Sequence, residues 1–265
     1  MTPIIDTHCH VYPEKIAVKA SENTAHFYGI PASYDGTVAT LKMQAAQAGI
    51  AHAVINSVAT APKQVSAINR FIAGTVAESG GTMTGLGTLH PDSEDAESDV
   101  EQAIALGLKG IKLHPDIQHF SLDEPRVMRL FALCEGRLPM LLHLGDRRYD
   151  YSNPNRVKTV LEAFPRLRVI GAHFAGWSIW EEATHELSGY ENLLVDCSSS
   201  MYALTPEKTV ELIRIYGAER VLFGTDYPLM SPVTETERFL KLALTPDERE
   251  RILWKNAAAF YGIEP

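Results

Sequence analysis

The chain repeats one unit along its length, a short apolar run followed by a longer segment with the spacing of an amphipathic helix. The apolar runs predict eight strands, over residues 4–6, 53–57, 84–88, 110–113, 140–143, 169–172, 193–196 and 221–223. The segments between them predict helices over residues 37–48, 62–79, 93–106, 125–135, 155–164, 177–187 and 206–216. Because a helix-sized crossover separates successive strands, we expect the strands to be parallel.

Eight such units predict an α/β fold, a single (β/α)8 TIM barrel over residues 1–265. A doubly wound open sheet normally has a glycine-rich first turn, and no GxGxxG follows the first strand. Residues 11–36 precede the first helical pattern and predict an extended loop after strand one, at the end of a barrel where active sites lie. A capping box at Thr245 and Glu248 predicts a C-terminal helix. Its apolar end, residues 254–261, either caps the barrel or meets a second copy of the chain in a homodimer.

Charge and cysteine content exclude several kinds of partner. With 24 basic and 33 acidic residues, the chain has a formal charge of −9, the wrong sign for nucleic acid or an anionic membrane surface. No apolar run approaches the roughly 18 residues of a membrane span. The three cysteines lie far apart without CxxC spacing, which indicates neither a disulfide framework nor a thiolate zinc site. We therefore expect a cytoplasmic protein that acts on a small molecule.

Histidine is concentrated where the predicted strands end. Six of the ten histidines lie at these ends: His8, His10, His90, His114, His143 and His173. Strand eight is followed by Asp226. In a (β/α)8 barrel the carboxyl ends of all strands meet at one rim, so these side chains converge. Core packing alone gives no reason for such a distribution, which indicates a functional site.

The first strand ends in the sequence DTHCH, residues 6–10. Side chains two residues apart in a strand point to the same face, so we expect Asp6, His8 and His10 to face one way and Cys9 the other. Neutral imidazoles and a carboxylate suit zinc, and also manganese, iron or cobalt. The sequence therefore predicts a metal site. Its first-choice ligands are His8, His10, His143 and Asp226.

Four motifs resemble the amidohydrolase superfamily: DTHCH at residues 6–10, LLHLGD at 141–146, GAHFAGW at 171–177 and FGTDYP at 223–228. The resemblance is closer to the amidohydrolase-2 branch, which includes aminocarboxymuconate semialdehyde decarboxylase and related decarboxylases and hydrolases. It spans essentially the whole chain and implies a TIM barrel with a metal site. It does not specify the substrate.

The resemblance also implies roles for single residues. His8 and His10 match the ligands from strand one, while His143 and Asp226 match the ligands from strands five and eight. His173 matches a histidine that binds metal in binuclear relatives and acts as a base or orienting group in mononuclear ones. We expect the second role, with one metal ion rather than two. Asp226 or His173 then takes or returns a proton.

Three residues are candidates for binding the substrate, which we expect to be anionic: Lys112, His114 and Arg147. Lys112 and His114 are two residues apart and face the same side of their strand. In binuclear relatives a carboxylated lysine bridges two metals, but we expect an ammonium that neutralises a substrate carboxylate or pairs with a buried acid. Arg147 either forks onto a carboxylate or is an exposed loop charge.

These observations predict a metal-dependent hydrolase that acts on a small, carboxylate-bearing molecule through a metal-activated water. Nonoxidative decarboxylation on the same metal is the alternative, because the ligands do not separate the two reactions. A barrel that binds a metal or metabolite without turnover is a third interpretation. It is disfavoured because the complete set of motif histidines and Asp226 is present.

Overall fold

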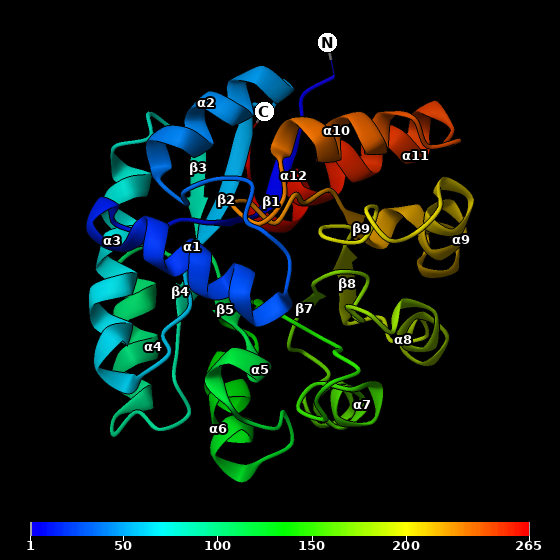
Figure 1. Cartoon of the computed structure of the whole chain (residues 1–265). Coiled ribbons are helices and arrows are strands. Elements are labelled where there is room, and N and C mark those ends of the chain that lie inside the picture. Colours follow the sequence, from blue (N-terminus) through cyan, green and yellow to red (C-terminus); the bar gives the residue numbers. More distant parts are fainter. Residues whose placement is uncertain (1, 265) are drawn as a thin grey trace.

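The computed structural model describes residues 2–264 and has the predicted parallel α/β architecture (Figure 1). The strands are β1 (Ile5–His10), β2 (His52–Asn56), β3 (Met83–Gly85), β4 (Gly87–Thr88), β5 (Ile111–Leu113), β6 (Met140–Leu142), β7 (Val169–Gly171), β8 (Leu193–Asp196) and β9 (Val221–Leu222). β3 and β4 fall within one predicted strand, over residues 84–88, that is interrupted at Leu86. The eight predicted strands are therefore confirmed.

The strands form two sheets, ordered β1-β2-β3 and β4-β5-β6-β7-β8-β9, and backbone hydrogen bonds link them. On one side, Leu86 N donates to Ile55 O at 2.9 Å. On the other, Thr7 N donates to Phe223 O at 2.9 Å, so the first strand lies beside the end of the last. The chain thus forms a TIM barrel, as predicted.

The helices outside the strands mostly follow the predicted segments. They are α2 (Val38–Ala48), α3 (Val65–Ala77) after the short turn η1 (Pro62–Gln64), α4 (Ala96–Ala105), α5 (Pro115–Gln118), α6 (Pro125–Cys134), α7 (Pro154–Ala163), α8 (Trp180–Leu187), α9 (Pro206–Tyr216), η2 (Ala218–Arg220) and α10 (Pro232–Leu240). Local chemistry fixes several of their starts. Before α9, for example, the Thr205 side chain accepts a hydrogen bond from Lys208 N, and proline occupies the first turn.

The prediction of an extended loop over residues 11–36 is wrong in one respect, because the segment contains α1 (Glu14–Tyr28). This helix buries only Ala17 and Ser21, while Ile16 and Val18 are 51% and 55% exposed. It therefore lacks the broad apolar stripe by which a packed helix is recognised in a sequence. It ends at Gly29, whose left-handed φ of 67° suits glycine.

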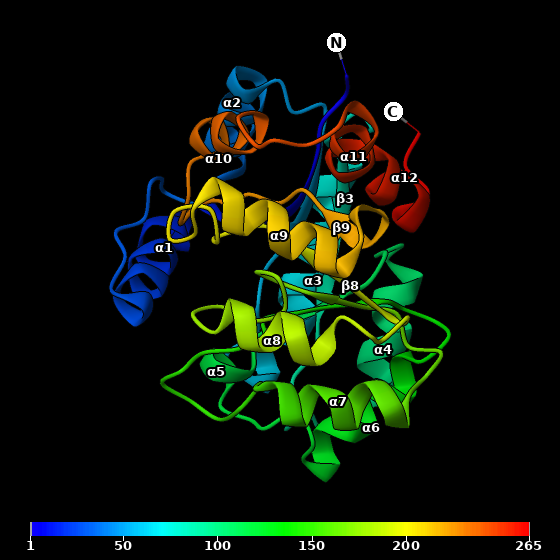
Figure 2. The same ribbon diagram turned by 90° about the vertical axis from the view of Figure 1, so that its right-hand side faces the viewer.

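The C-terminal helix is present as α11 (Pro246–Glu250), the π-helical turn η3 (Arg251–Lys255) and α12 (Asn256–Tyr261). The capping box of Thr245 and Glu248 is confirmed. α12 packs into an apolar cluster with strand residues: Ile5, Val54, Leu86, Leu141, Ile170, Ala172 and Leu222. Figure 2 places α12 and α1 on opposite sides of the molecule, so α12 caps the end of the barrel away from α1. Of the two interpretations of residues 254–261, the barrel cap is confirmed.

No helix within residues 2–264 combines the length and the apolar character needed to cross a membrane.

The packing of α12 predicts the effect of truncating Phe260, which is 7% exposed and stacks under the Arg168 guanidinium at 3.9 Å. Phe260→Ala should lower the free energy of unfolding by about 3 kcal/mol, because it removes a buried ring and leaves a cavity. Urea denaturation followed by circular dichroism measures this. Leu240→Ala, at a side chain 47% exposed, is the control and should change stability by less than about 0.5 kcal/mol. Equal losses in both variants would contradict the capping role.

Candidate metal centre

A β-bulge in β1 sets the direction of the first-strand side chains. Asp6 pairs with Ala53 and Cys9 with Ile55, so β1 has one more residue than β2 between these pairs. Asp6 therefore turns to the side of Cys9, and its carboxylate accepts hydrogen bonds from Thr225 N at 2.9 Å and Thr225 Oγ1 at 2.5 Å. The prediction that Asp6 faces the same way as the two histidines is wrong, because the bulge interrupts the alternation.

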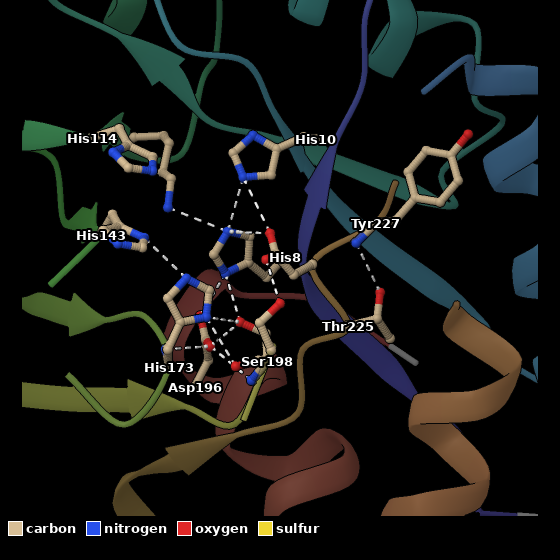
Figure 3. Close-up of polar contacts among 12 residues, drawn as sticks. His8, His10, His114, His143, His173, Asp196, Ser198, Thr225 and Tyr227 are labelled. Atoms are coloured by element: carbon tan, nitrogen blue, oxygen red, sulfur yellow. Dashed lines mark hydrogen bonds and ion pairs between the residues drawn. The ribbon is translucent and has the colours of Figure 1, made fainter. Parts of the chain in front are cut away.

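His8, His10 and Asp226 meet at the carboxyl end of the barrel. Figure 3 shows the two histidines side by side, with His173 and Asp196 next to His8. His8 Nε2 and His10 Nε2 lie 3.1 Å apart, and Asp226 Oδ1 lies 3.5 Å from each. The second Asp226 oxygen accepts a hydrogen bond from Ser199 Oγ at 2.5 Å. Burial, with the neighbouring His8 and Lys112, holds the pKa of His10 well below its usual value. His10 is therefore neutral, which is the form that ligates a metal.

Asp196, at the end of β8, holds His8 in position. Its Oδ2 lies 2.9 Å from His8 Nδ1, and its Oδ1 accepts hydrogen bonds from His173 N at 3.1 Å and Ser198 Oγ at 2.5 Å. Burial alone would raise the pKa of Asp196, but the facing His8 and His173 and the Ser198 hydroxyl lower it below its usual range. The ionised Asp196 accepts the Nδ1 proton of His8 and leaves the Nε2 lone pair facing the cluster.

His173 has its tautomer fixed in a similar way. Its Nδ1 lies 2.9 Å from Ser198 O and 3.0 Å from Ser198 Oγ, whose own proton goes to Asp196. Nδ1 therefore carries the proton and Nε2 the lone pair. Burial lowers the pKa of His173 to about 4, although Asp226 opposes this. This neutral imidazole can accept a proton or bind a metal through Nε2, which lies 3.1 Å from His143 Nδ1.

His143 lies beside the cluster of His8, His10 and Asp226 but is not part of it. Its Nδ1 is 3.1 Å from His173 Nε2, and its Nε2 is 3.5 Å from Asp116 Oδ2. Its ring stacks on that of His114, with centroids 4.0 Å apart and planes 8° from parallel. A metal lies in the plane of a ligating imidazole at roughly 2.1 Å from its nitrogen. Two parallel rings at this spacing cannot both bind one ion, so we assign no separate metal site to His114, Asp116 and His143.

α1 brings an aromatic side chain that the sequence did not single out as functional. The Tyr28 hydroxyl lies 2.5 Å from His114 Nε2 and 3.3 Å from His143 Nε2. Arg148 anchors this end of α1, because it donates to Phe27 O at 2.7 Å and lies over the Phe27 and Tyr28 rings at 4.9 and 5.6 Å. The only hint in the sequence is the aromatic pair in the long first connection.

A cavity of about 770 Å³ opens onto the cluster. Five predicted site residues line it: His10, His114, His143, His173 and Asp226. His8 and Lys112 are fully buried and are absent from its lining. Arg147 is also absent from the lining, since it is exposed and its guanidinium donates to Ser178 O at 2.7 Å. The structure thus brings His114, but neither Lys112 nor Arg147, to the cavity wall.

The donor set fits a divalent cation with nitrogen and oxygen ligands. Two imidazole nitrogens and a carboxylate oxygen approach one another, and Asp196 orients one of the imidazoles from behind. Asn56, in register with His10, is fully buried, and neither of its amide atoms has a hydrogen-bond partner among residues 2–264. A buried polar group in native protein normally has a partner. Sequence analysis did not single out Asn56, although it ends the second strand.

Lys112 has a different environment from the one predicted for a substrate contact. Its Nζ lies 3.2 Å from His8 Nε2, inside the barrel. Burial lowers its pKa from 10.5 to about 8, and the charges of Asp196 and Asp226 limit the shift. Nζ does not line the cavity and forms no ion pair within residues 2–264, so neither predicted alternative describes it; its hydrogen-bonding partner is the His8 imidazole.

The lowered pKa of Lys112 predicts that the stability of the metal-free protein depends on pH. Between pH 8 and 10.5 the unfolded state binds the Lys112 proton and the folded state does not, so this residue's contribution to stability rises with pH. Its burial costs about 3 kcal/mol below pH 8 and nothing above pH 10.5. Lys112→Met should raise the free energy of unfolding at pH 8. This increase should be smaller by about 3 kcal/mol at pH 10.5. Urea titrations at several pH values measure it, and a gain that does not change with pH would contradict it.

Comparisons with known proteins agree with this architecture. The amidohydrolase family profile matches residues 5–263. A TIM-barrel protein of uncharacterised function from Bordetella bronchiseptica is 22% identical, with 98% of each chain covered and a TM-score of 0.82. A 5-carboxyvanillate decarboxylase from Novosphingobium aromaticivorans, complexed with manganese and 4-hydroxy-3-methoxy-5-nitrobenzoic acid, is 14% identical. The matched residues cover 98% of this chain and 96% of the decarboxylase chain, and the TM-score is 0.77.

A third solved structure comes from Pseudomonas putida and is provisionally assigned as a 2-pyrone-4,6-dicarboxylic acid hydrolase. It is 21% identical to this chain. The matched residues cover 100% of this chain and 99% of the Pseudomonas chain, and the TM-score is 0.69. At these identities the solved structures establish the fold, and the match of the family profile over nearly the whole chain establishes the family. The chain belongs to the amidohydrolase family, in its amidohydrolase-2 branch, and is a metal-dependent TIM-barrel enzyme.

Proposed function

We propose that this chain is a metal-dependent hydrolase that acts on a small, carboxylate-bearing molecule. The observation that carries the proposal is the position of Asp226 and His173, which line the same cavity as His10 of the cluster. Two groups that can exchange protons therefore adjoin the place where a cation would lie. Hydrolysis needs both, one to take a proton from water and one to give a proton to the leaving group.

We propose that His8, His10 and Asp226 hold one ion, with His143 as the fourth ligand. The first three meet as described, and His143 lines the same cavity as His10 and Asp226. Zinc is the first choice because two or three imidazoles and a carboxylate suit it, and manganese, iron or cobalt accept the same ligands. The manganese in the Novosphingobium decarboxylase supports a divalent cation in this fold.

In this proposal, protons are transferred by residues whose side chains are held in position by hydrogen bonds to their neighbours. A divalent cation held by these residues would supply Lewis-acid chemistry and would lower the pKa of a water molecule that it coordinates. His173 presents the Nε2 lone pair as the base, because Ser198 retains its Nδ1 proton. The proton that His173 takes from water passes to Asp226, held by Ser199, which delivers it to the leaving group. His114 contacts the substrate carboxylate in this proposal, since Lys112 and Arg147 lie away from the cavity wall.

Nonoxidative decarboxylation is the second candidate. Here the carbon–carbon bond to the carboxylate breaks, carbon dioxide leaves, and His173 or Asp226 delivers a proton to the carbon. The TM-score of 0.77 to a manganese-bound decarboxylase favours it. The positions of Arg147 and Lys112 weigh against it, because neither of these cations lines the cavity where it could hold the departing carboxylate.

Three further expectations concern the cellular location of the chain, its assembly and the charge of its substrate. The three cysteines are free and buried, which supports the proposal of a reducing, cytoplasmic location. A homodimer stays a prediction. An anionic small molecule as the substrate is consistent with a cavity that is lined by several neutral imidazoles and adjoins the proposed cation site.

Metal content tests the ligand set. Protein expressed with added zinc or manganese should contain about one equivalent of metal, and His10→Asn and His143→Asn should each retain less than about a tenth. His185→Asn, at an exposed histidine of α8, is the control and should keep full occupancy. Elemental analysis measures this. Full occupancy in His143→Asn would remove it from the ligand set, and full occupancy in His10→Asn would overturn the metal site.

Isotope labelling separates the two reactions. A panel of lactones, amides and hydroxybenzoates is incubated with the metal-loaded enzyme in H₂¹⁸O, and mass spectrometry follows both labelled acid and carbon dioxide. Hydrolysis places ¹⁸O in the product, and Asp226→Asn should lower that rate by about 10²-fold or more. Carbon dioxide released without ¹⁸O in the organic product would replace the hydrolase by the decarboxylase. If neither product depends on Asp226, both proposals fail.

A further inference from the structure

We propose that the substrate is longer than a single-ring acid and carries a second anionic group. In this arrangement one end reaches the metal centre, an apolar body lies between α1 and α3, and the second anion meets Lys19 and Lys63. The inference rests on the proposed function, because it assigns the rest of the cavity to the substrate of that same site.

The cavity continues well beyond the metal centre. Its inner end is lined by His10, His173 and Asp226, and most of its other lining residues come from α1 and from the segment formed by η1 and α3. Figure 1 shows α1 crossing in front of the strands, with α3 beside it. A volume of about 770 Å³ falls in the range of roughly 300–1,000 Å³ that holds drug-sized ligands. A single aromatic acid would fill only the inner end.

Apolar side chains form the middle of the cavity. α1 contributes Ile16 and Ala20, and α3 contributes Ala67, Ile68 and Phe71. Ile16 is 51% exposed and lines the cavity, so an apolar group bound there would cover it. Because both helices supply apolar side chains to this one cavity, a flat apolar body can pack against them.

The charges of the lining residues indicate which kind of ligand group binds at the outer part of the cavity. Lys19 on α1 and Lys63 on η1 are both exposed and line this cavity. Among the described lining residues, Asp226 at the metal centre is the one carboxylate. Neither lysine forms an ion pair within residues 2–264, although acidic residues outnumber basic ones in the chain. Two cations without a nearby lining acid favour a second anionic group on the ligand.

A series of binding probes tests this with the metal-loaded protein. Isothermal titration with benzoate, naphthalene-2-carboxylate and naphthalene-2,6-dicarboxylate measures the contributions of the apolar body and the second anion separately. We expect the affinity to rise at least fivefold at each step. Equal affinities for all three probes would overturn the proposal.

Two pairs of variants locate the contacts. Lys19→Gln combined with Lys63→Gln should abolish the preference for the dicarboxylate, whereas Lys15→Gln combined with Arg70→Gln should keep it. Lys15 and Arg70 are exposed on α1 and α3 but do not line the cavity. If both pairs lose the preference equally, the effect is one of overall charge and the lysine site is overturned.

The apolar wall is tested by filling it. Ala67→Trp should weaken both naphthalene acids at least tenfold and leave benzoate within twofold. Ala77→Trp, at an exposed position of α3 outside the lining, is the matched control and should leave all affinities unchanged. Weak binding of benzoate to Ala67→Trp would overturn the division of the cavity. Because titration does not need turnover, this result is independent of the isotope experiment, in which failure of the proposed function would appear.

Discussion

The pairing of the first strand with the end of the last strand positions the whole site. Asp226 N donates to His8 O at 2.8 Å, and His10 N donates to Tyr227 O at 2.7 Å. These two bonds place residues more than 200 positions apart in the chain within ligand distance of one another. Asp226 has a φ of 66°, a left-handed conformation that costs a non-glycine residue about 1 kcal/mol or more. The bonds to β1 and to Ser199 offset that cost and fix the direction of its carboxylate.

Asp196 extends this organisation inward. One buried carboxylate accepts hydrogen bonds from His8 Nδ1, His173 N and the Ser198 hydroxyl, and so joins the ends of β1, β7 and β8. A buried charge is tolerated only when its hydrogen-bonding capacity is used, and here these three donors and Ser198 N use it. The same bonds determine which nitrogen of His8 faces the cluster. Stability and reactivity at this end of the barrel therefore depend on the same contacts.

Periodicity was sufficient to predict the strands and hence the rim, because each parallel strand must be followed by a crossover. It placed His8, His10 and Asp226 together correctly. It failed for Asp6, because a β-bulge shifts the alternation by one residue and leaves no mark in the sequence.

Loop and helix positions at the rim were harder to predict. α1 was missed because its apolar side chains face a cavity and solvent instead of a packed core. Arg147 and Arg148 are adjacent in one loop, and only tertiary contacts decide their environments. Arg148 lies over aromatic rings of α1, whereas Arg147 binds Ser178. Tyr28 depends on the same contacts, since its position relative to His114 follows from where α1 ends.

The two parts of the cavity thus have different physical origins. Strand ends supply the imidazoles and carboxylate, and backbone pairing within the barrel fixes their geometry. α1, η1 and α3 supply most of the remaining lining residues, and α1 is attached by few buried side chains and by the contacts of Arg148. Side chains on such an element can change without disturbing the barrel, because little of the core depends on them. If the substrate extends along the cavity as we propose, chemistry at the rim and selection of the substrate are separable in this chain, and variants of α1 would change selection without changing the metal ligands.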